Sequence, residues 1–187
     1  MPDRDPLPFD PIAEARRQWG AHGWDQAAPA MAVVTSIMRV QQILLGRADA
    51  ALRPFDLTFA RYEVLMLLSF SAHGVLALGK IGERLQVNPA SVTNAIDRLE
   101  EQGLVEREPN PADGRGTLAR VTDLGRARAA DATVAMNDAV FSDVGVTDDD
   151  LELLFALLRR VRREAGDFSE ARRATRRARA GGAATRR

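Results

Sequence analysis

The sequence predicts a mainly α-helical fold with one small β-hairpin. Hydrophobic residues make up 45% of the 187 residues and aromatic residues only 5%, so the core must consist mostly of Leu, Val, Ile and Ala, which favours helices. Apolar residues also recur at helical spacing through most of the chain. The exception is residues 104–122, where the runs LVERE and TLARVT flank the turn-rich stretch NPADGRG. We therefore expect one helical domain with a single hairpin and extensions at both ends.

The composition excludes several kinds of site. The chain contains no cysteine, which excludes disulfides, thiolate metal sites and a cysteine nucleophile. The two histidines, His22 and His73, lie too far apart for a metal-ligand motif, so we expect no metal and no cofactor. No apolar run reaches the roughly 18 residues that span a bilayer, and the opening MPDRDPLPFD does not resemble a signal peptide. We expect a cytoplasmic protein without a membrane partner.

The N-terminal part contains two expected helices. Residues 1–28 form an extension in which PIAEARRQWG (11–20) begins with Pro and ends with Gly, as a short helix does. Residues 29–56 contain a long helix that reaches about Arg53 and is ended by Pro54. Its apolar stripe is wide, which predicts burial on more than one side, and consists of Val33, Val34, Ile37, Val40, Ile43, Leu44, Ala48 and Leu52.

The central region, residues 57–122, has three expected helices before the hairpin. Thr58 is a good N-cap for the first of them. The second is short and is marked by Leu78, Ile81 and Leu85. Asn88 caps the third, with Pro89 at the first position, where its missing N–H costs nothing, and Gly103 ends it. The hairpin of residues 104–122 follows directly.

The C-terminal region, residues 123–168, has two expected helices. Thr122 caps a long helix that reaches about Val144, and Thr147 opens the last helix, whose first turn is acidic and so favours the helix dipole. Residues 169–187 are rich in Arg and have no large apolar side chain to bury, which predicts a disordered tail. Such a tail is either a non-specific nucleic-acid contact or a solvated end without a specific role.

The order of short helix, tight turn, second helix and hairpin predicts a winged helix-turn-helix that binds double-stranded DNA. An α-helix fits the major groove, and the preceding helix crosses the DNA backbone and holds it in place. An Arg at the hairpin tip can enter the narrow minor groove, where negative potential is concentrated. Taken alone, the second helix also fits an ordinary amphipathic surface helix, and the hairpin that follows it favours DNA binding.

The candidate DNA contacts come from this helix and from the hairpin tip. Small polar side chains permit close approach to base edges, and an Asn amide can pair bidentately with adenine. At the tip, the Asp113 carboxylate can accept hydrogen bonds from the Arg115 guanidinium and hold it extended. The expected contacts are Asn88, Pro89, Ala90, Ser91, Thr93, Asn94, Arg98, Asp113 and Arg115. We expect no catalytic residues.

Three segments resemble the MarR family of transcriptional regulators. They are LTFARYEVLMLL (57–68), LGKIGERLQVNPASVTNAIDRLEEQGLVERE (78–108) and DGRGTLARVTDLGR (113–126). The resemblance implies a homodimer that forms through N- and C-terminal helices, here 29–53, 123–144 and 148–165. It also implies palindromic DNA, Arg115 in the minor groove, and a small-molecule effector between the dimerisation and DNA-binding parts. Gly114 departs from the family pattern, in which many relatives carry another Arg.

A finer resemblance connects three residues with a possible effector site. The urate-responsive branch of the family has an extra N-terminal helix bearing a Trp, an acid early in the second helix and an Arg at the end of the first wing strand. Trp19, Glu63 and Arg107 stand in matching places. The sequence departs from that branch at Ala95, which replaces an Arg of the recognition helix, and at Glu63, which replaces an Asp. Alternatively, Trp19 attaches the extra helix to a partner subunit and Glu63 and Arg107 are structural.

The expected function is a sequence-specific regulator, a repressor released from its operator by a small aromatic or anionic effector. One alternative is a winged-helix module that contacts proteins and does not bind specific DNA. An enzyme is disfavoured, because the sequence shows no nucleotide-binding glycine motif and no converging catalytic set.

Overall fold

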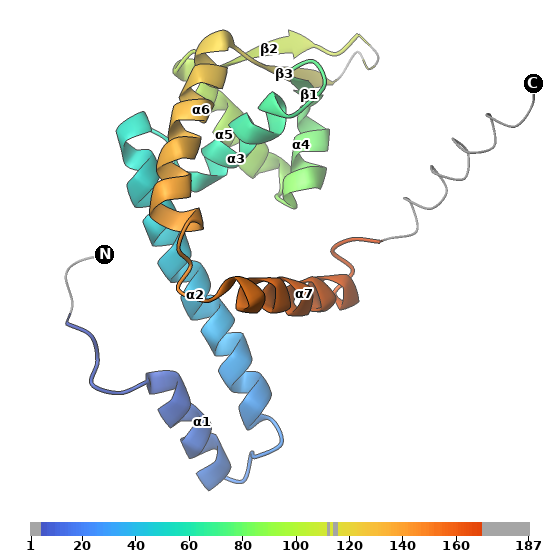
Figure 1. Ribbon diagram of the computed structural model, residues 1–187. Coiled ribbons are helices and arrows are strands. Elements are labelled where there is room, and N and C mark those ends of the chain that lie inside the picture. Colours follow the sequence, from blue (N-terminus) through green and yellow to red (C-terminus); the bar gives the residue numbers. More distant parts are fainter. Residues whose placement is uncertain (1–4, 112, 114–115, 170–187) are drawn as a thin grey trace, which may run out of the picture. The chain divides into compact units, whose positions relative to one another are not determined.

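The computed structural model describes residues 5–111, 113 and 116–169, and it shows a mainly helical chain with a small antiparallel sheet (Figure 1). The described residues fall into two units, divided between Asp143 and Val144. The first unit contains α1 (Pro11–Ala21), α2 (Ala28–Leu52), a 3-10 turn (Arg53–Phe55), α3 (Phe59–Ser69), β1 (Val75–Ala77), α4 (Leu78–Leu85), α5 (Pro89–Glu101), β2 (Val105–Pro109), β3 (Thr117–Val121) and α6 (Asp123–Met136). The second contains α7 (Asp148–Glu164). The predicted fold class is confirmed.

Side-chain caps fix where the central helices begin. In each case the oxygen of an extended residue accepts a hydrogen bond from a backbone N–H in the first helical turn, which satisfies one of the donors left free at a helix start. Asn88 Oδ1 accepts from the Ser91 N–H at 2.8 Å, with Pro89 at the first position of α5. The four caps expected from the sequence are confirmed: Thr58, Asn88, Thr122 and Thr147.

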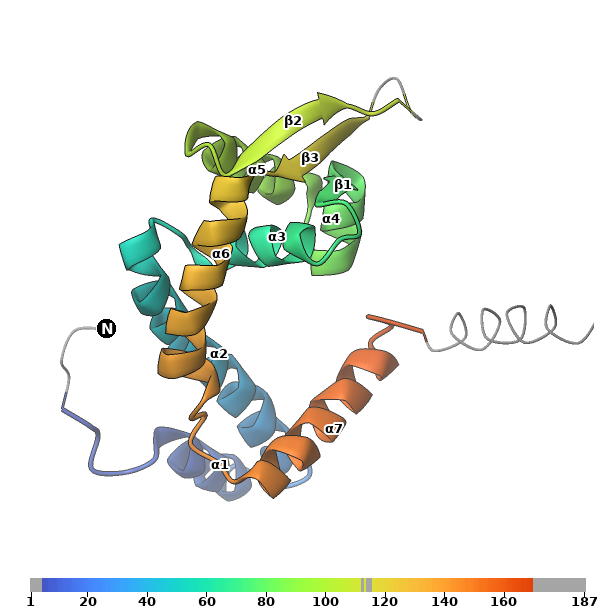
Figure 2. The ribbon, with the colours of Figure 1, turned by 45° about the horizontal axis from the view of Figure 1, so that its top comes forward.

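The sheet has three strands in the order β1-β3-β2 (Figure 2). The expected hairpin is formed by β2 and β3, which pair with Arg107 opposite Ala119. The third strand, Val75–Ala77, was not predicted from the sequence, and it pairs antiparallel with β3. Three residues are too few to show the two-residue alternation of a strand, and their partner lies more than 40 residues away. This third strand anchors the base of the hairpin beside α4.

The core lies where the second half of α2 meets α3, α4, α5, the sheet and α6. Leucine, valine and alanine make up most of it, as the low aromatic content predicted. Its largest fully buried side chains are Leu52, Leu65, Leu68, Ile81, Ile96, Leu99, Leu104, Met136 and Val105. Because α5 and β2 both contribute to this core, the recognition helix and the hairpin are held on one rigid base.

The start of α6 passes very close to the chain that leaves α5. Thr122 caps α6 through the Gly125 N–H at 2.9 Å, while its own hydroxyl donates to the Gly103 carbonyl at 2.8 Å. A Cβ placed on Gly125 would lie 2.1 Å from the Leu104 carbonyl oxygen, closer than any side chain tolerates. The sequence pattern Thr-x-x-Gly therefore does two things here: Thr122 begins the helix and Gly125 permits the close approach.

Helix α2 is only half covered within the chain. Ala48 and Leu52 are buried in the core, but the expected burial of the earlier stripe is wrong for the single chain, since Val33, Val34 and Ile37 are exposed. By length and composition alone, Ala28–Phe55 could cross a membrane, although the sequence showed no continuous apolar run of that length. Its last turns are packed in the protein core through Ala48 and Leu52, and Asp49 there accepts a hydrogen bond from the Phe59 N–H at the start of α3.

The C-terminal helices differ in detail from the expectation. The α-helical part of α6 ends at Met136 and continues as a π-helical turn over Asn137–Phe141, so the helix stops slightly before the predicted Val144. The described part of the second unit contains one helix. Its helix α7 has no buried residue, and it exposes the apolar side chains Leu153, Leu154, Phe155, Leu157 and Val161.

Candidate nucleic-acid interface

Helices α4 and α5 form the helix-turn-helix. The chain leaves α4 through Gln86, which adopts the left-handed conformation (φ 56°) and reverses direction, and the Val87 N–H then donates to the Gly82 carbonyl at 3.2 Å. Ile81 of α4 and Ile96 of α5 are both fully buried in the shared core. The tight turn and this common packing fix α5 relative to α4, as a helix that enters a DNA groove requires.

One face of α5 is buried and the opposite face is exposed. Val92, Ala95, Ile96 and Leu99 face the core. All the candidate DNA contacts of this segment are exposed, and they are Asn88, Pro89, Ala90, Ser91, Thr93, Asn94 and Arg98. Ala90, Ser91, Thr93 and Asn94 give the first half of this face a small, polar surface, which can approach base edges closely.

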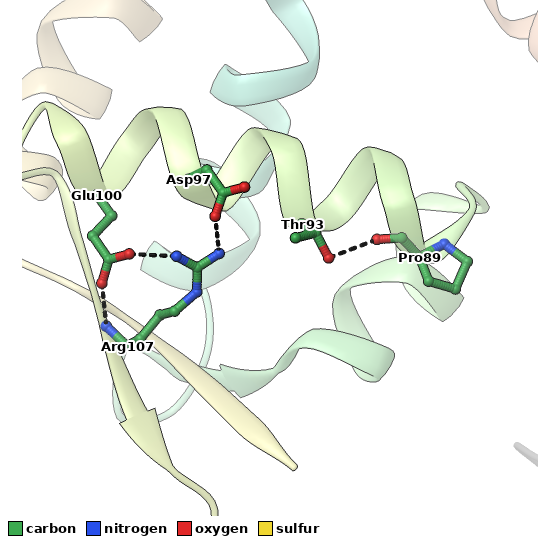
Figure 3. A network of polar contacts seen from close by, with 5 residues as sticks. All are labelled: Pro89, Thr93, Asp97, Glu100 and Arg107. Atoms are coloured by element: carbon green, nitrogen blue, oxygen red, sulfur yellow. Dashed lines mark hydrogen bonds and ion pairs between the residues drawn. The ribbon is translucent and has the colours of Figure 1, made fainter. Parts of the chain in front are cut away.

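The polar groups on this face are not equally available for binding. The Asn88 oxygen is engaged in its cap, and the Thr93 hydroxyl donates to the Pro89 carbonyl at 3.0 Å, which leaves the hydroxyl oxygen able to accept (Figure 3). Arg98 pairs with Glu101 at 2.8 Å. Asn94 makes no side-chain hydrogen bond with any other residue that the structure describes. Its amide is therefore the group on this face best prepared to pair with a base.

The second half of α5 is joined to the hairpin by ion pairs. Arg107 of β2 donates to the carboxylates of Asp97 and Glu100, and its backbone N–H also donates to Glu100 Oε1 at 3.3 Å (Figure 3). Partial burial by itself lowers the pKa of the Arg107 guanidinium, but the hydrogen bonds and charges of the two acids together raise its pKa above the usual value. Sequence reasoning missed this pairing. The available signal was the two-residue alternation of β2, which places Arg107 on the same face as buried Val105.

The wing is an antiparallel ribbon of β2 and β3, and backbone hydrogen bonds join the described residues near its tip. Asn110 donates its N–H to the Gly116 carbonyl at 3.0 Å, and Gly116 donates to the Asp113 carbonyl at 2.8 Å. Lower on the ribbon, Arg120 of β3 pairs with Glu108 of β2, and this pair lowers the pKa of the Glu108 carboxyl. Asp113 is exposed at the tip, whereas Gly114 and Arg115, and with them the expected Asp113–Arg115 pair, lie outside the described residues.

The three residues of the possible effector site are separated in the single chain. Trp19 of α1 contacts Trp24, with ring centroids 5.4 Å apart. Glu63 of α3 is partly buried, and this burial raises the pKa of its carboxyl. Arg107 is held by the acids of α5. Among the described residues no hydrogen bond or ion pair joins these three, and no group of three or more acids and histidines is arranged to hold a metal ion.

Comparison with known proteins identifies the family. A model described as the MarR family matches residues 55–116, which contain the helix-turn-helix and the first strand of the wing. The multiple antibiotic resistance protein MarR of Escherichia coli is 30% identical over 112 residues, which cover 59% of this chain and 76% of that protein. The chain belongs to the MarR family. The repressor IacR of Pseudomonas putida is 32% identical over 89 residues, and this match covers 48% of the chain and 52% of IacR, about half the length of that relative.

Solved structures of MarR-family proteins share the fold. Sco5413 of Streptomyces coelicolor, a MarR-family transcriptional regulator, is 51% identical with a TM-score of 0.70, covering 76% of this chain and 99% of that chain. A mutant of E. coli MarR in complex with operator DNA is 27% identical with a TM-score of 0.66, covering 72% and 96%. CouR of Rhodococcus jostii RHA1, bound to p-coumaroyl-CoA, is 28% identical with a TM-score of 0.61, covering 69% and 90%.

Proposed function

We propose that this MarR-family protein is a transcriptional regulator that binds double-stranded DNA sequence-specifically, with α5 in the major groove. The observation that carries the proposal is the exposed, small and polar first half of α5, held on a common core with the wing. The likeness to E. coli MarR in complex with operator DNA supports the same use of this surface. In this proposal Asn94 reads a base, and Ser91, Thr93 and Arg98 contact bases or phosphates.

The wing completes the DNA contact. In the family pattern Arg115 enters the minor groove, and Asp113 holds the guanidinium extended from the tip. Arg115→Ala is expected to weaken operator binding and to lower its salt dependence by about one charge. An unchanged affinity and salt dependence for Arg115→Ala would remove the wing from the interface.

Asn94→Ala is expected instead to relax base preference. A loss of affinity that is the same for all DNA sequences would show that Asn94 contacts phosphate only.

The active form in this proposal is a homodimer. The first half of α2 exposes Val33, Val34, Ile37 and Met38, and α7 has no buried residue at all. Apolar helix faces of this extent need a partner in water. A second copy of the chain supplies matching helices, and two recognition helices about 34–36 Å apart suit successive turns of a palindromic operator. Binding to DNA also favours a cytoplasmic location.

The proposed regulation is release from DNA by a small effector. CouR was solved with p-coumaroyl-CoA, which supports small-molecule binding in this fold but does not identify the effector of this chain. An effector that binds better to a different spacing of the recognition helices weakens DNA binding by that difference in affinity. An effector pocket formed by Trp19, Glu63 and Arg107 remains a prediction, and an anion there must compete with two carboxylates for Arg107. A dimer melting temperature unchanged by millimolar urate would remove the urate version.

A gel-shift experiment tests the proposed function. The probe is the DNA upstream of the protein's own gene and of its neighbours, with scrambled DNA of the same length as control, and the assay is repeated with phenolic and purine compounds. Sequence-specific binding that survives deletion of residues 169–187 supports the regulator and rejects the protein-interaction module. Equal affinity for specific and scrambled DNA would reject the regulator. No catalytic role is proposed.

A further inference from the structure

Arg107 is the one basic side chain of β2, and it contacts both acids on the outer face of α5 that lie nearest to the wing. Asp97 and Glu100 are three positions apart, so their carboxylates lie on the same side of the helix. The two terminal nitrogens of the guanidinium each take one carboxylate, and the Arg107 backbone N–H adds a third bond (Figure 3). The side chain is 27% exposed, so the contact is partly shielded from water.

The charges of α5 show why this contact matters. The helix carries three carboxylates, on Asp97, Glu100 and Glu101, and one guanidinium, on Arg98, which is paired with Glu101. A helix that approaches DNA meets roughly one negative charge per 1.7 Å of duplex, so uncompensated carboxylates on it oppose binding. Arg107, from another element, offsets one of the two negative charges of Asp97 and Glu100, the acids that Arg98 does not reach.

The fold does not depend on these ion pairs to hold β2 against α5. Leu99, Leu104 and Val105 are essentially fully buried at the same junction and supply the packing. Asp97 and Glu100 remain 50% and 40% exposed, and ion pairs so exposed contribute only about 0–1 kcal/mol to folding. The value of the network therefore lies in the charge and orientation of the DNA-facing surface.

We propose that Arg107 is a positioning residue for DNA binding, which offsets part of the negative charge of Asp97 and Glu100 and joins the recognition helix to the wing without touching DNA itself. This inference rests on the proposed DNA-binding function and adds to it a residue that acts through others. The loss of Arg107 should therefore be repaired by removing the carboxylate charges of Asp97 and Glu100.

The test compares operator affinity for the wild type, Arg107→Met, the double variant D97N/E100Q, and the triple variant that combines them. Methionine keeps an apolar stem of similar length, and Asn and Gln keep the shapes of the acids. We expect Arg107→Met to bind about tenfold more weakly, because like charges brought together at an interface weaken association. We expect the double variant to bind as well as or better than the wild type, and the triple variant to return to within about twofold of the wild type. The loss in Arg107→Met should shrink as salt rises from about 0.05 to 0.3 M, since screening weakens the repulsion.

The control is Arg17→Met. Arg17 makes a two-bond ion pair with Glu14 on α1, outside the helix-turn-helix and wing, so its loss should leave operator affinity unchanged. The inference would be overturned if Arg107→Met lost as much affinity in the D97N/E100Q background as in the wild-type background, or if the double variant bound more weakly than the wild type, because the loss of a direct phosphate contact or of a purely structural contact does not depend on the charges of Asp97 and Glu100. A wild type without specific DNA binding would instead overturn the proposed function, and the inference with it. Thermal melting of each variant confirms that it is folded.

Discussion

At the scale of single residues, two glycines in helices have opposite surroundings. A Cβ on Gly125 would meet the Leu104 carbonyl oxygen at 2.1 Å and Val121 Cγ2 at 2.9 Å, whereas a Cβ on Gly79 would meet nothing within 4 Å. Gly125 is required because it packs against a backbone that cannot move aside. Gly79 lies in an exposed turn of α4, where a side chain has room.

These surroundings predict opposite effects of the same substitution. Gly125→Ala is expected to lower the free energy of unfolding by about 3 kcal/mol, because the overpacked start of α6 must shift. Gly79→Ala is expected to raise it by up to about 1 kcal/mol, since Ala has the better helix propensity. Urea denaturation of the two variants measures both. Equal effects would show that the close approach at Gly125 is not rigid.

The partly buried carboxyl of Glu63 makes the stability of the fold depend on pH. Burial raises the pKa of its carboxyl, so the folded state holds the proton more tightly than the unfolded state does, and stability falls as pH rises above the ordinary Glu pKa of about 4.3. The Gln side chain in Glu63→Gln does not ionise, so the variant does not lose stability in this way as pH rises. The variant should melt at a higher temperature than the wild type at pH 7, and the difference should disappear near pH 4. A difference that is the same at both values would contradict the assignment.

At the scale of elements, the joint between α2 and α3 connects the long helix with the DNA-binding region. Asp49 of α2 accepts a hydrogen bond from the Phe59 N–H at 2.9 Å, at the start of α3. Gln102, just after α5, donates to the Asp56 carboxylate at 2.8 Å, and Asp56 itself adopts a left-handed conformation. The joint is thus held by the Asp49 side chain of α2 and by the Gln102 side chain that follows α5.

Removal of the Asp49 side chain tests how firmly this joint is held. Asp49→Ala is expected to cost about 1 kcal/mol of unfolding free energy, the usual value of an N-terminal cap. Asp49→Asn keeps an oxygen acceptor and should cost less than half as much, which makes it the matched control. Denaturation curves give both values, and an equal cost for the two would mean that the negative charge, rather than the hydrogen bond, is what stabilises α3.

Elements whose cause is local could be predicted from the sequence, and those with distant causes could not. Thr58, Asn88, Thr122 and Thr147 each cap a helix through the residue three positions further on, so the sequence alone located these helix starts. Strand β1 exists because β3 pairs with it from the other end of the winged region. The partners of Arg107 were missed for the same reason, because a helix and a strand bring them together only after both have packed on the core.

At the scale of the whole molecule, the exposed apolar helices predict a dimer that a single substitution can dissociate. Val34 on α2 is 52% exposed, and a charge there would be buried without a partner in the proposed dimer. Val34→Asp is expected to sediment as a monomer and to lose specific operator binding. Phe70→Asp is the control: Phe70 is 78% exposed at the end of α3, outside the proposed dimer helices, and its replacement should leave the dimer intact. A dimeric Val34→Asp would place the interface elsewhere.

The half-covered α2 has a consequence for gene control. The last turns of this helix are packed in the core of its own chain, and in the proposed dimer its exposed apolar face is covered by a second chain. Pairing, and the DNA binding proposed to depend on it, then obey the law of mass action. Where monomers predominate, the number of pairs grows with the square of the number of chains. Halving the supply of protein then leaves a quarter of the pairs, and a modest change in synthesis becomes a steep change in operator occupancy, even before any effector is present.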